Sequence, residues 1–472
     1  MSEFLTLSLT GAAQAIRDRK VSSVELTQAA LARAHALQPK FNAFVRFDDE
    51  KALAEARKCD AELAAGKPRG PLHGVPLAHK DMFYRAGEVS TCGSRLREGW
   101  KAGATAAVLE KLDAAGALQI GTLNMTEFAY GPTGQNGWLG DARNPWNPDY
   151  ITGGSSAGSG VSVASRIVFG ALGSDTAGSV RMPSSICGIT GMKTTFGRVS
   201  RANCMPLSQS LDTVGPLTRT VEDNALMLAV IAGQDARDGA TLAVPVPDYV
   251  AAAKAGSLKG VKIGIPRGFF DDKLEDDVRA LLDAAAGVYK ELGADVFEVK
   301  MPDVDAINAA GFLLTWGDVQ AVHGEWMARR TGEYSPQTKG RIEVTLGATV
   351  RDYVDAQRYR GRALREFCAA VFGQCDALLA PILSFAVPKI AEVDVSGGPN
   401  MLRILDEITR LMRPVNTLGL PGLALPAGFT PNGLPCGMQM LGRPFAEALL
   451  YRIGAAYQSA TDWHARMPTA AQ

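Results

Sequence analysis

The residues best suited to chemistry lie in one glycine- and serine-rich stretch, residues 153–183, which reads GGSSAGSGVSVASRIVFGALGSDTAGSVRMP. Two glycine/serine clusters, 153–159 and 173–179, flank a short apolar run. Glycine loses more backbone freedom on folding than any other residue, so this density marks places where the chain turns tightly or approaches another group. Serine hydroxyls beside a row of backbone N–H donors are the material for a serine nucleophile with an oxyanion hole.

A base for such a serine is offered by Lys80, which sits in the mostly apolar, strand-like run 75–81. Burial lowers the pKa of a lysine from about 10.4 toward neutrality, and a neutral amine can act as a general base. Ser179 follows Thr176-Ala177-Gly178, whose N–H groups can converge on one oxygen. None of the five histidines, at positions 35, 73, 79, 323 and 464, lies in a pattern that pairs it with these serines.

An alternative nucleophile is Ser156, because residues 154–158 match the G-x-S-x-G elbow of α/β-hydrolases. That fold places an acid and then a histidine after the serine, and only His323 and His464 follow, in helix-like and tail-like contexts. The elbow also follows an apolar strand directly, whereas Asn147-Pro148-Asp149-Tyr150 precedes this one. A purely structural interpretation remains for each single serine, since glycine/serine loops are most often turns.

Strands and helices alternate around these residues, which indicates an α/β fold with a mixed β-sheet covered by helices on both faces. Hydrophobic periodicity and turn residues predict the following elements. Helices are expected before residue 66 and at 104–115, 157–165, 221–232, 275–292, 303–370 (mostly helical), 400–412 and 444–460. Strands are expected at 75–81, 118–123, 167–172, 261–266, 294–300, 377–382, 423–429 and 437–441, with a linker at 235–260.

The composition excludes several classes of protein. The 472 residues include 49 lysines and arginines and 49 aspartates and glutamates, so the net charge is zero. This balance does not indicate binding to nucleic acid or to an anionic membrane. The seven cysteines are dispersed, without C-x-x-C or zinc spacing, as expected for reduced thiols in a cytoplasmic protein. No signal peptide and no 18-residue apolar run is apparent. We therefore expect a cytoplasmic protein with no membrane or nucleic-acid partner, no metal and no cofactor.

Taken together, several motifs resemble the amidase signature family over nearly the whole chain, most specifically between residues 74 and 220. The matching runs are Gly74-Val75-Pro76 with Lys80-Asp81, residues 124–129 (NMTEFA), 144–146 (NPW), 153–159, 173–183, Cys187-Gly188, 191–197 (GMKTTFG) and 416–442.

The resemblance implies a Ser–cis-Ser–Lys triad. Matched position by position, Ser179 is the nucleophile, Ser155 the bridging serine after a cis Gly154–Ser155 bond, and Lys80 the base. Lys80 would take a proton from Ser155, which takes one from Ser179 as it attacks the carbonyl carbon. The N–H groups of Thr176, Ala177, Gly178 and Ser179 would hold the oxyanion, and one such donor is worth roughly 3–4 kcal/mol. Asp81, Ser156, Asp175 and Arg181 are the expected supporting residues, with Arg181 pairing Asp175.

One position departs from the family pattern. The family commonly has glycine where this chain has Ala177, and a methyl group disfavours a positive φ. Because the backbone nitrogen remains, we expect the oxyanion hole to be kept and the acyl pocket to be reshaped slightly. Ala129 and Ser155 are the expected substrate-binding positions, and the aromatic residues of 303–413 are either pocket walls or ordinary packing.

The function that this resemblance implies is hydrolysis of a C–N bond in a small or aryl amide, or a carbamate, through an acyl-enzyme on Ser179. The predicted enzyme is a single domain over residues 1–472, with a catalytic core at 74–220 and a variable helical lobe at 303–413. A small-molecule amide is its expected substrate and a homodimer its possible assembly.

Two other functions compete with this one. The first is the glutaminase (A-type) subunit of a tRNA-dependent amidotransferase. It is disfavoured by the run Arg181-Met182-Pro183-Ser184-Ser185, which differs from the Arg-Gln-Pro-Ala type associated with that subunit. The second, a non-catalytic binding protein, is disfavoured because Lys80, Ser155 and Ser179 are all present.

Overall fold

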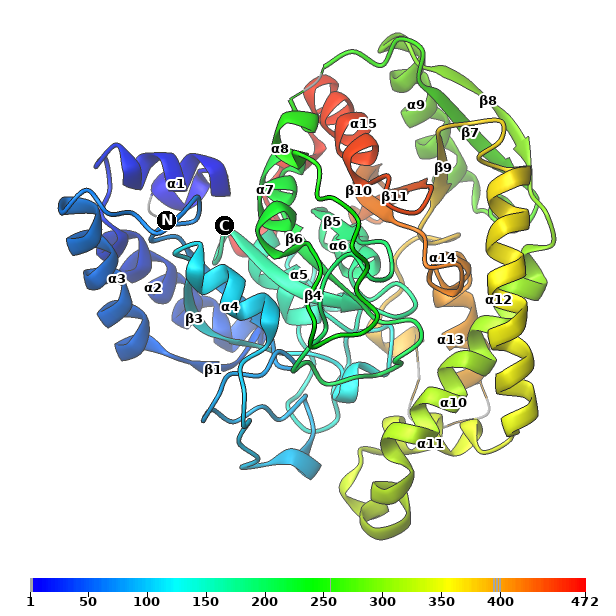
Figure 1. Ribbon diagram of the computed structural model, residues 1–472, viewed down its shortest axis with the longest axis horizontal. Helices are drawn as coiled ribbons and strands as arrows, with labels where there is room; N and C mark the ends of the chain where they lie inside the picture. Colours follow the sequence, from blue (N-terminus) through cyan, green and yellow to red (C-terminus); the bar gives the residue numbers. More distant parts are fainter. Residues whose placement is uncertain (1–2, 255, 394, 396–397, 399) are drawn as a thin grey trace.

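A single mixed sheet of eleven strands runs through the computed structural model, with helices packed around it (Figure 1). The structure describes residues 3–254, 256–393, 395, 398 and 400–472. The strands are β1 (Phe44–Phe47), β2 (Pro76–Lys80), β3 (Leu118–Leu123), β4 (Gly170–Asp175), β5 (Thr190–Lys193), β6 (Thr213–Thr218), β7 (Lys262–Arg267), β8 (Asp295–Lys300), β9 (Ala377–Pro381), β10 (Gly422–Phe429) and β11 (Pro435–Gly442).

Fifteen α-helices accompany these strands in the described residues. They are α1 (Leu9–Arg17), α2 (Ser23–Phe41), α3 (Asp49–Ala64), α4 (Ala107–Ala114), α5 (Ala157–Ala164), α6 (Arg181–Cys187), α7 (Val221–Ile231), α8 (Tyr249–Ala252), α9 (Asp276–Glu291), α10 (Val304–Arg330), α11 (Pro336–Thr345), α12 (Val350–Ala370), α13 (Met401–Thr409), α14 (Arg413–Thr417) and α15 (Glu447–Ala460). The α/β class predicted from the sequence is confirmed. None of the described helices combines the length and hydrophobicity that a membrane span requires.

The strand order in the sheet is β1-β3-β2-β4-β6-β5-β10-β11-β9-β7-β8. Strand β2 runs parallel to both of its neighbours, β3 and β4, and β7 runs parallel to β8 and β9. The remaining pairs are antiparallel. The parallel β–α–β unit predicted for residues 261–300 is therefore confirmed as β7, α9 and β8.

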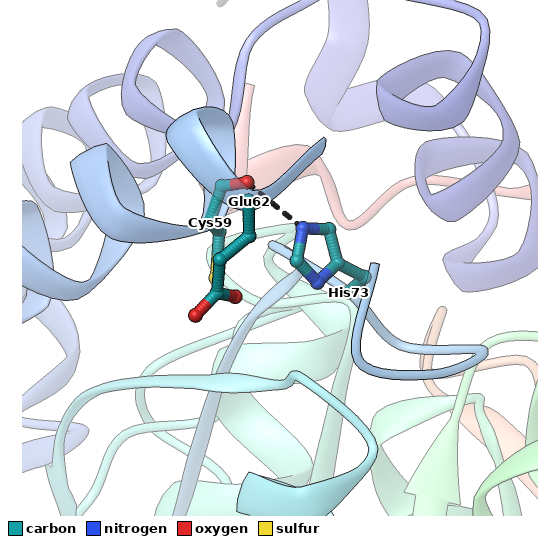
Figure 2. A group of neighbouring side chains, drawn as sticks. All are labelled: Cys59, Glu62 and His73. Carbon is teal, nitrogen blue, oxygen red and sulfur yellow. Dashed lines mark hydrogen bonds between the residues drawn. The ribbon is translucent and has the colours of Figure 1, made fainter. Parts of the chain in front are cut away.

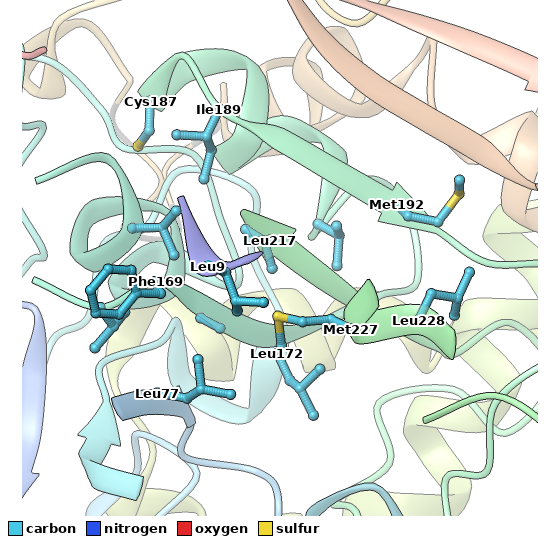
Figure 3. Packing of buried hydrophobic residues seen from close by; sticks show 14 of the residues in the cluster. Leu9, Leu77, Phe169, Leu172, Cys187, Ile189, Met192, Leu217, Met227 and Leu228 are labelled. Atoms are coloured by element: carbon cyan, nitrogen blue, oxygen red, sulfur yellow. The ribbon is translucent and has the colours of Figure 1, made fainter. Parts of the chain in front are cut away.

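The central strands are held in a continuous apolar core (Figure 3). Leu77, Leu172 and Leu217 come from the neighbouring strands β2, β4 and β6, and each is fully buried. Met227 and Leu228 of α7 pack against the same cluster. Because interiors of this kind are close-packed, the ends of β2 and β4 are rigid platforms for the side chains that they carry.

Helices α10 to α13 lie on the right of the view in Figure 1. Helix α10 begins where the side chain of Asp303 accepts a hydrogen bond from the N–H of Ala306, and it packs against α11, α12 and α14. Helix α12 begins with a capping box formed by Thr349 and Asp352. The mostly helical structure predicted for residues 303–370 agrees with these elements.

Some boundaries differ from the sequence-based expectation. Strand β4 spans Gly170–Asp175 instead of 167–172, so the second glycine/serine cluster begins inside a strand. Strands β5 and β6 and helix α6 were not predicted, because glycine and proline interrupt their apolar patterns. The predicted linker 235–260 contains the short helix α8, and the strands on either side of it, β6 and β7, belong to the same sheet.

Candidate active site

Lys80 is the last residue of β2 and its side chain is fully buried. All five residues of β2 are buried, because the strand lies between β3 and β4. The Nζ atom of Lys80 donates to Ser155 Oγ at 2.7 Å and to Ser174 Oγ at 2.9 Å. Burial lowers the pKa of Lys80 from 10.5 to about 7, although the nearby acidic groups of Asp212, Asp175 and Cys92 oppose the shift. The amine can therefore lose its proton near neutral pH.

Ser155 follows a cis peptide bond, Gly154–Ser155, which agrees with the expectation from the family resemblance. A side chain at residue 154 would collide with the carbonyl oxygen of Gly131, at 2.7 Å, so glycine is required there. Ser179 lies at the edge of a cavity and is 8% exposed. No hydrogen bond joins Ser155 to Ser179 among the described residues, and catalytic hydrogen bonds are often long before substrate binds.

The loop between β4 and α6 carries the four N–H groups expected to form the oxyanion hole. The N–H of Gly178 is already engaged, because it donates to Asp175 Oδ1 at 2.7 Å, and this corrects its predicted role. The N–H groups of Thr176, Ala177 and Ser179 have no partner in the part of the chain that the structure describes, and all three residues line the cavity. These three groups are left to hold an oxyanion.

The same loop explains how this chain accommodates Ala177. The left-handed backbone lies at Gly178, where φ is 115°, and Ala177 is not among the residues with positive φ. The methyl group therefore sits in ordinary backbone geometry and lines the cavity instead of straining the loop.

Asp175 and Arg181 form a buried ion pair with an Nε–Oδ2 distance of 3.0 Å, as predicted. Burial alone would raise the pKa of Asp175, but the Arg181 guanidinium holds it well below its usual range. Arg181 also donates to Gln439 Oε1 at 2.7 Å and to Asn416 Oδ1 at 2.5 Å. The pair thus connects the loop that carries Ser179 to strand β11 and helix α14.

Two predicted supporting residues act elsewhere. The carboxylate of Asp81 accepts hydrogen bonds from the N–H and hydroxyl of Thr91, and burial raises its pKa to about 6. Ser156 donates to the carbonyl oxygen of Ser174 at 3.4 Å. Neither side chain contacts Lys80 among the described hydrogen bonds and ion pairs, whereas Ser174 does. The predicted strand ended at residue 172, two residues before Ser174. With the observed bounds of β4, the alternation of side chains along the strand would have indicated Ser174 as a neighbour of Lys80.

A cavity of about 570 Å³ opens beside the nucleophile. Ala129, the predicted substrate-binding position, and Trp316, one of the lobe aromatics, both line it. Other aromatic residues of the lobe pack elsewhere: Trp326 and Tyr334 stack around Phe128. The charged residues of the wall are Arg341, Arg403, Asp406 and Arg413, none of which was predicted.

Arg341 has an unusual environment for a charged side chain. It is 2% exposed, and it donates through Nη1 to the carbonyl oxygen of Tyr130. Its Nε and Nη2 atoms are buried without a hydrogen-bond partner in the described residues. Burial lowers the pKa of Arg341 to about 10, so it stays charged at neutral pH. Arg341 lines the cavity, so its guanidinium places a positive charge at this wall that favours a carboxylate ligand, although Nε and Nη2 themselves are covered.

Asp406 and Arg413 form a second charged feature of the cavity wall. Arg413 Nη1 lies 3.1 Å from Asp406 Oδ1 and donates to Asn308 Oδ1 at 2.7 Å. The Arg413 guanidinium stacks over the ring of Phe312. The Asp406 side chain keeps 41% of its surface exposed, so its carboxylate stays accessible to a ligand.

A separate cluster of Cys59, Glu62 and His73 has the composition of a metal site (Figure 2). Its ligand atoms are already engaged. His73 Nε2 donates to the Cys59 carbonyl oxygen at 2.9 Å, and Nδ1 accepts from the Arg69 N–H at 3.1 Å. Glu62 pairs with Arg69 at 2.7 Å, and burial raises the pKa of the Cys59 thiol to about 11. These contacts give the cluster a structural role between α3 and β2.

Comparison with known proteins identifies the family of this site. The family model described as Amidase matches residues 25–451. The chain belongs to the amidase family. It is 39% identical over 481 residues to the A-type subunit of glutamyl-tRNA(Gln) amidotransferase from Methylococcus capsulatus, covering 98% of each chain.

Solved structures agree with this assignment. One, from a protein complex described in connection with the origins of an s-triazine catabolic enzyme, has a TM-score of 0.90 and 34% identity, covering 96% of this chain and 98% of the other. Another, the A-type subunit of glutamyl-tRNA(Gln) amidotransferase from Thermotoga maritima, has a TM-score of 0.81 and 29% identity, covering 99% and 98%.

These relatives correct the function and partners predicted from the sequence. The prediction of a stand-alone hydrolase of small or aryl amides or carbamates is wrong, because relatives 36–39% identical over nearly the full chain are amidotransferase subunits. The expectation of a lone enzyme or homodimer without a nucleic-acid partner is wrong for the same reason.

The run at 181–185, which had argued against the amidotransferase, fills structural roles. Met182 is buried in an apolar cluster, Ser184 donates to the carbonyl oxygen of Val180 at 2.8 Å, and Ser185 accepts from the N–H of Gly437 at 2.9 Å.

Proposed function

We propose that this chain is the glutaminase subunit of a tRNA-dependent amidotransferase. Ser179 attacks the side-chain amide carbon of glutamine, the leaving ammonia departs with a proton returned by the relay, and water hydrolyses the glutamyl-enzyme. The ammonia is then used by a partner subunit on an acyl group carried by tRNA. The observation that carries the proposal is the 39% identity to an amidotransferase subunit of the A type along the whole chain.

The catalytic residues take the roles that the family resemblance implies. Lys80, with its lowered pKa, accepts the proton of Ser155, and Ser155 accepts that of Ser179. The N–H groups of Ala177 and Ser179, together with that of Thr176, stabilise the tetrahedral oxyanion. Each donor of this kind contributes roughly 3–4 kcal/mol to the transition state.

The charges of the cavity wall support a free amino acid as substrate. Glutamine carries a carboxylate and an ammonium on its α-carbon. The positive charge of Arg341 at the cavity wall suits the carboxylate, and the exposed Asp406 carboxylate suits the ammonium. A neutral aryl amide would leave the buried charge of Arg341 without an anionic partner, which is unfavourable.

We also keep the prediction of a cytoplasmic location as part of this proposal. It is supported by the seven cysteines, all of which are free thiols in the structure.

The test compares two substrates on an Arg341→Met variant. Losing a buried partner of a charged ligand costs about 2 kcal/mol or more, so KM for glutamine should rise roughly 30-fold. 4-Aminobutanamide, which is glutamine without its α-carboxylate, should react equally with the variant and the wild type. Arg403→Met is the matched control, because Arg403 lines the same cavity but is exposed and pairs with Glu407.

Two results contradict the proposal. One is an unchanged KM for glutamine in Arg341→Met. The other is a wild-type enzyme that hydrolyses glutamine no faster than 4-aminobutanamide.

A further inference from the structure

We propose that Asp212 is a positioning residue, which holds the oxyanion loop through Thr176 and supplies a negative charge near Lys80. Asp212 lies directly before β6 and is 6% exposed. Its neighbour Thr213 pairs with Asp175, the last residue of β4. The inference rests on the serine–lysine mechanism of the proposed function, and it does not require that glutamine be the substrate.

The first part of the argument is the set of donors around the carboxylate. Asp212 Oδ1 accepts from Thr176 Oγ1 at 2.5 Å, and Oδ2 accepts from the N–H groups of Leu207 at 2.9 Å and Ser208 at 3.0 Å. Burial raises the pKa of Asp212 and these hydrogen bonds oppose the rise. Three donors on two oxygens are the arrangement of an ionised carboxylate. Because Thr176 also carries an N–H group at the cavity, Asp212 fixes the orientation of an oxyanion donor.

The second part is the charge around the base. The titratable groups that act on Lys80 are Asp212, Asp175 and Cys92. Asp175 is neutralised by Arg181, and burial raises the pKa of the Cys92 thiol to about 12, so that it is uncharged.

Asp212 forms no ion pair among the described residues. The charged group that acts on it is Arg201, which lines the same small cavity but is itself paired with Asp238 at 3.0 Å. Within the described part of the chain, Asp212 is therefore the acidic group near the base that has no ion-pair partner of its own. Asp212 lies near the base, because it lines a small cavity of about 20 Å³ together with Ser174, the serine that Lys80 contacts.

A matched control lies on the other side of the same loop. Asp318 of α10 accepts from Ser210 N–H at 2.9 Å, Ser208 Oγ at 2.5 Å and Tyr353 Oη at 2.8 Å. It is buried to the same extent as Asp212, at 6% exposed, and it holds residues 208–210 as Asp212 holds 207–208. It is not among the groups that act on Lys80.

The experiment measures how fast a fluorophosphonate labels Ser179 between pH 5 and 8.5. In this reaction the Ser179 Oγ–P bond forms, the P–F bond breaks and fluoride leaves. The proton passes through Ser155 to Lys80. Asp212→Asn should slow labelling at least tenfold and move the acid limb of the rate profile to lower pH by about one unit, because the charge that favours protonated Lys80 is gone. Asp212→Glu and Asp318→Asn should keep the limb at the wild-type pH.

The proposal is overturned if the acid limb of Asp212→Asn stays at the wild-type pH. It is also overturned if Asp318→Asn moves the acid limb as far as Asp212→Asn does. If Asp212→Asn fails to fold, Thr176→Val decides. It should label about tenfold more slowly with an unshifted limb, and a wild-type rate overturns the proposal. A chain that labels normally but does not hydrolyse glutamine would refute the proposed function and leave this test intact.

Discussion

The pKa of Lys80 leads to a quantitative prediction for the dependence of activity on pH. Lys80 can accept the Ser155 proton only when its amine is neutral. Burial lowers the pKa of Lys80 from 10.5 to about 7, and among the described residues the side chain donates only to the uncharged Ser155 and Ser174. The activity should therefore follow the neutral fraction of this one group on the acid side.

The magnitude follows from the two pKa values. The difference between 10.5 and about 7 corresponds to roughly 5 kcal/mol between the protonation states. With a pKa near 7, about half of Lys80 is neutral at pH 7 and about 1% at pH 5. An unperturbed lysine would be neutral in only about 0.04% of molecules at pH 7.

The assay is kcat/KM for glutamine hydrolysis from pH 5 to 8.5 at constant ionic strength. We expect a single acid limb with a slope of one, a midpoint near pH 7 and a roughly 100-fold fall between the plateau and pH 5. Lys80→Met should remove the limb along with most of the activity. A limb that is absent, or that keeps rising above pH 9, would refute the assignment of Lys80 as the base.

Three further predictions each concern a single residue. Ser179→Ala should keep the wild-type melting temperature, lose at least about 1,000-fold in kcat and no longer be labelled by a fluorophosphonate. Gly178→Ala should inactivate the enzyme and destabilise it by about 1–3 kcal/mol, because φ is 115° there and the new methyl group would meet Met412. Its control is Gly66→Ala, where φ is 72° but nothing lies within 4 Å, so denaturation should show only the backbone penalty. Lys193, whose pKa burial also lowers to about 7, is protonated in the unfolded state but neutral in the folded state between pH 7 and 10.5. The stability of the wild type relative to Lys193→Met should therefore rise with pH in this window, by up to about 1.4 kcal/mol per pH unit in urea titrations.

The part of the site that could be predicted from the sequence lies within local motifs. Lys80 ends an apolar strand, and Ser155 and Ser179 lie in the two glycine/serine clusters. The pairing of Asp175 with Arg181 is a contact between residues six positions apart. Ser174 was missed because β4 was placed three residues too early, which hid the side chain that points at Lys80.

The substrate side of the site depends on contacts that no local pattern encodes. Arg341 and Asp406 lie in different helices, and their roles depend on which wall of the cavity each faces. In a sequence, Arg341 is an ordinary charged residue of a polar helix. Its burial with two partnerless nitrogen atoms, Nε and Nη2, arises only when α11 packs against the loop that carries Tyr130. The sequence pattern therefore could not predict whether the substrate is a neutral amide or a charged amino acid.

The most direct test of the central claim supplies the chain with its partner subunits, glutamate-charged tRNA(Gln), ATP and glutamine labelled with ¹⁵N in the side-chain amide. The account predicts that the label appears in glutamine attached to the tRNA, and that Ser179→Ala abolishes this transfer while added ammonium restores it. Failure of the wild-type chain to release the labelled amide under these conditions would contradict the account.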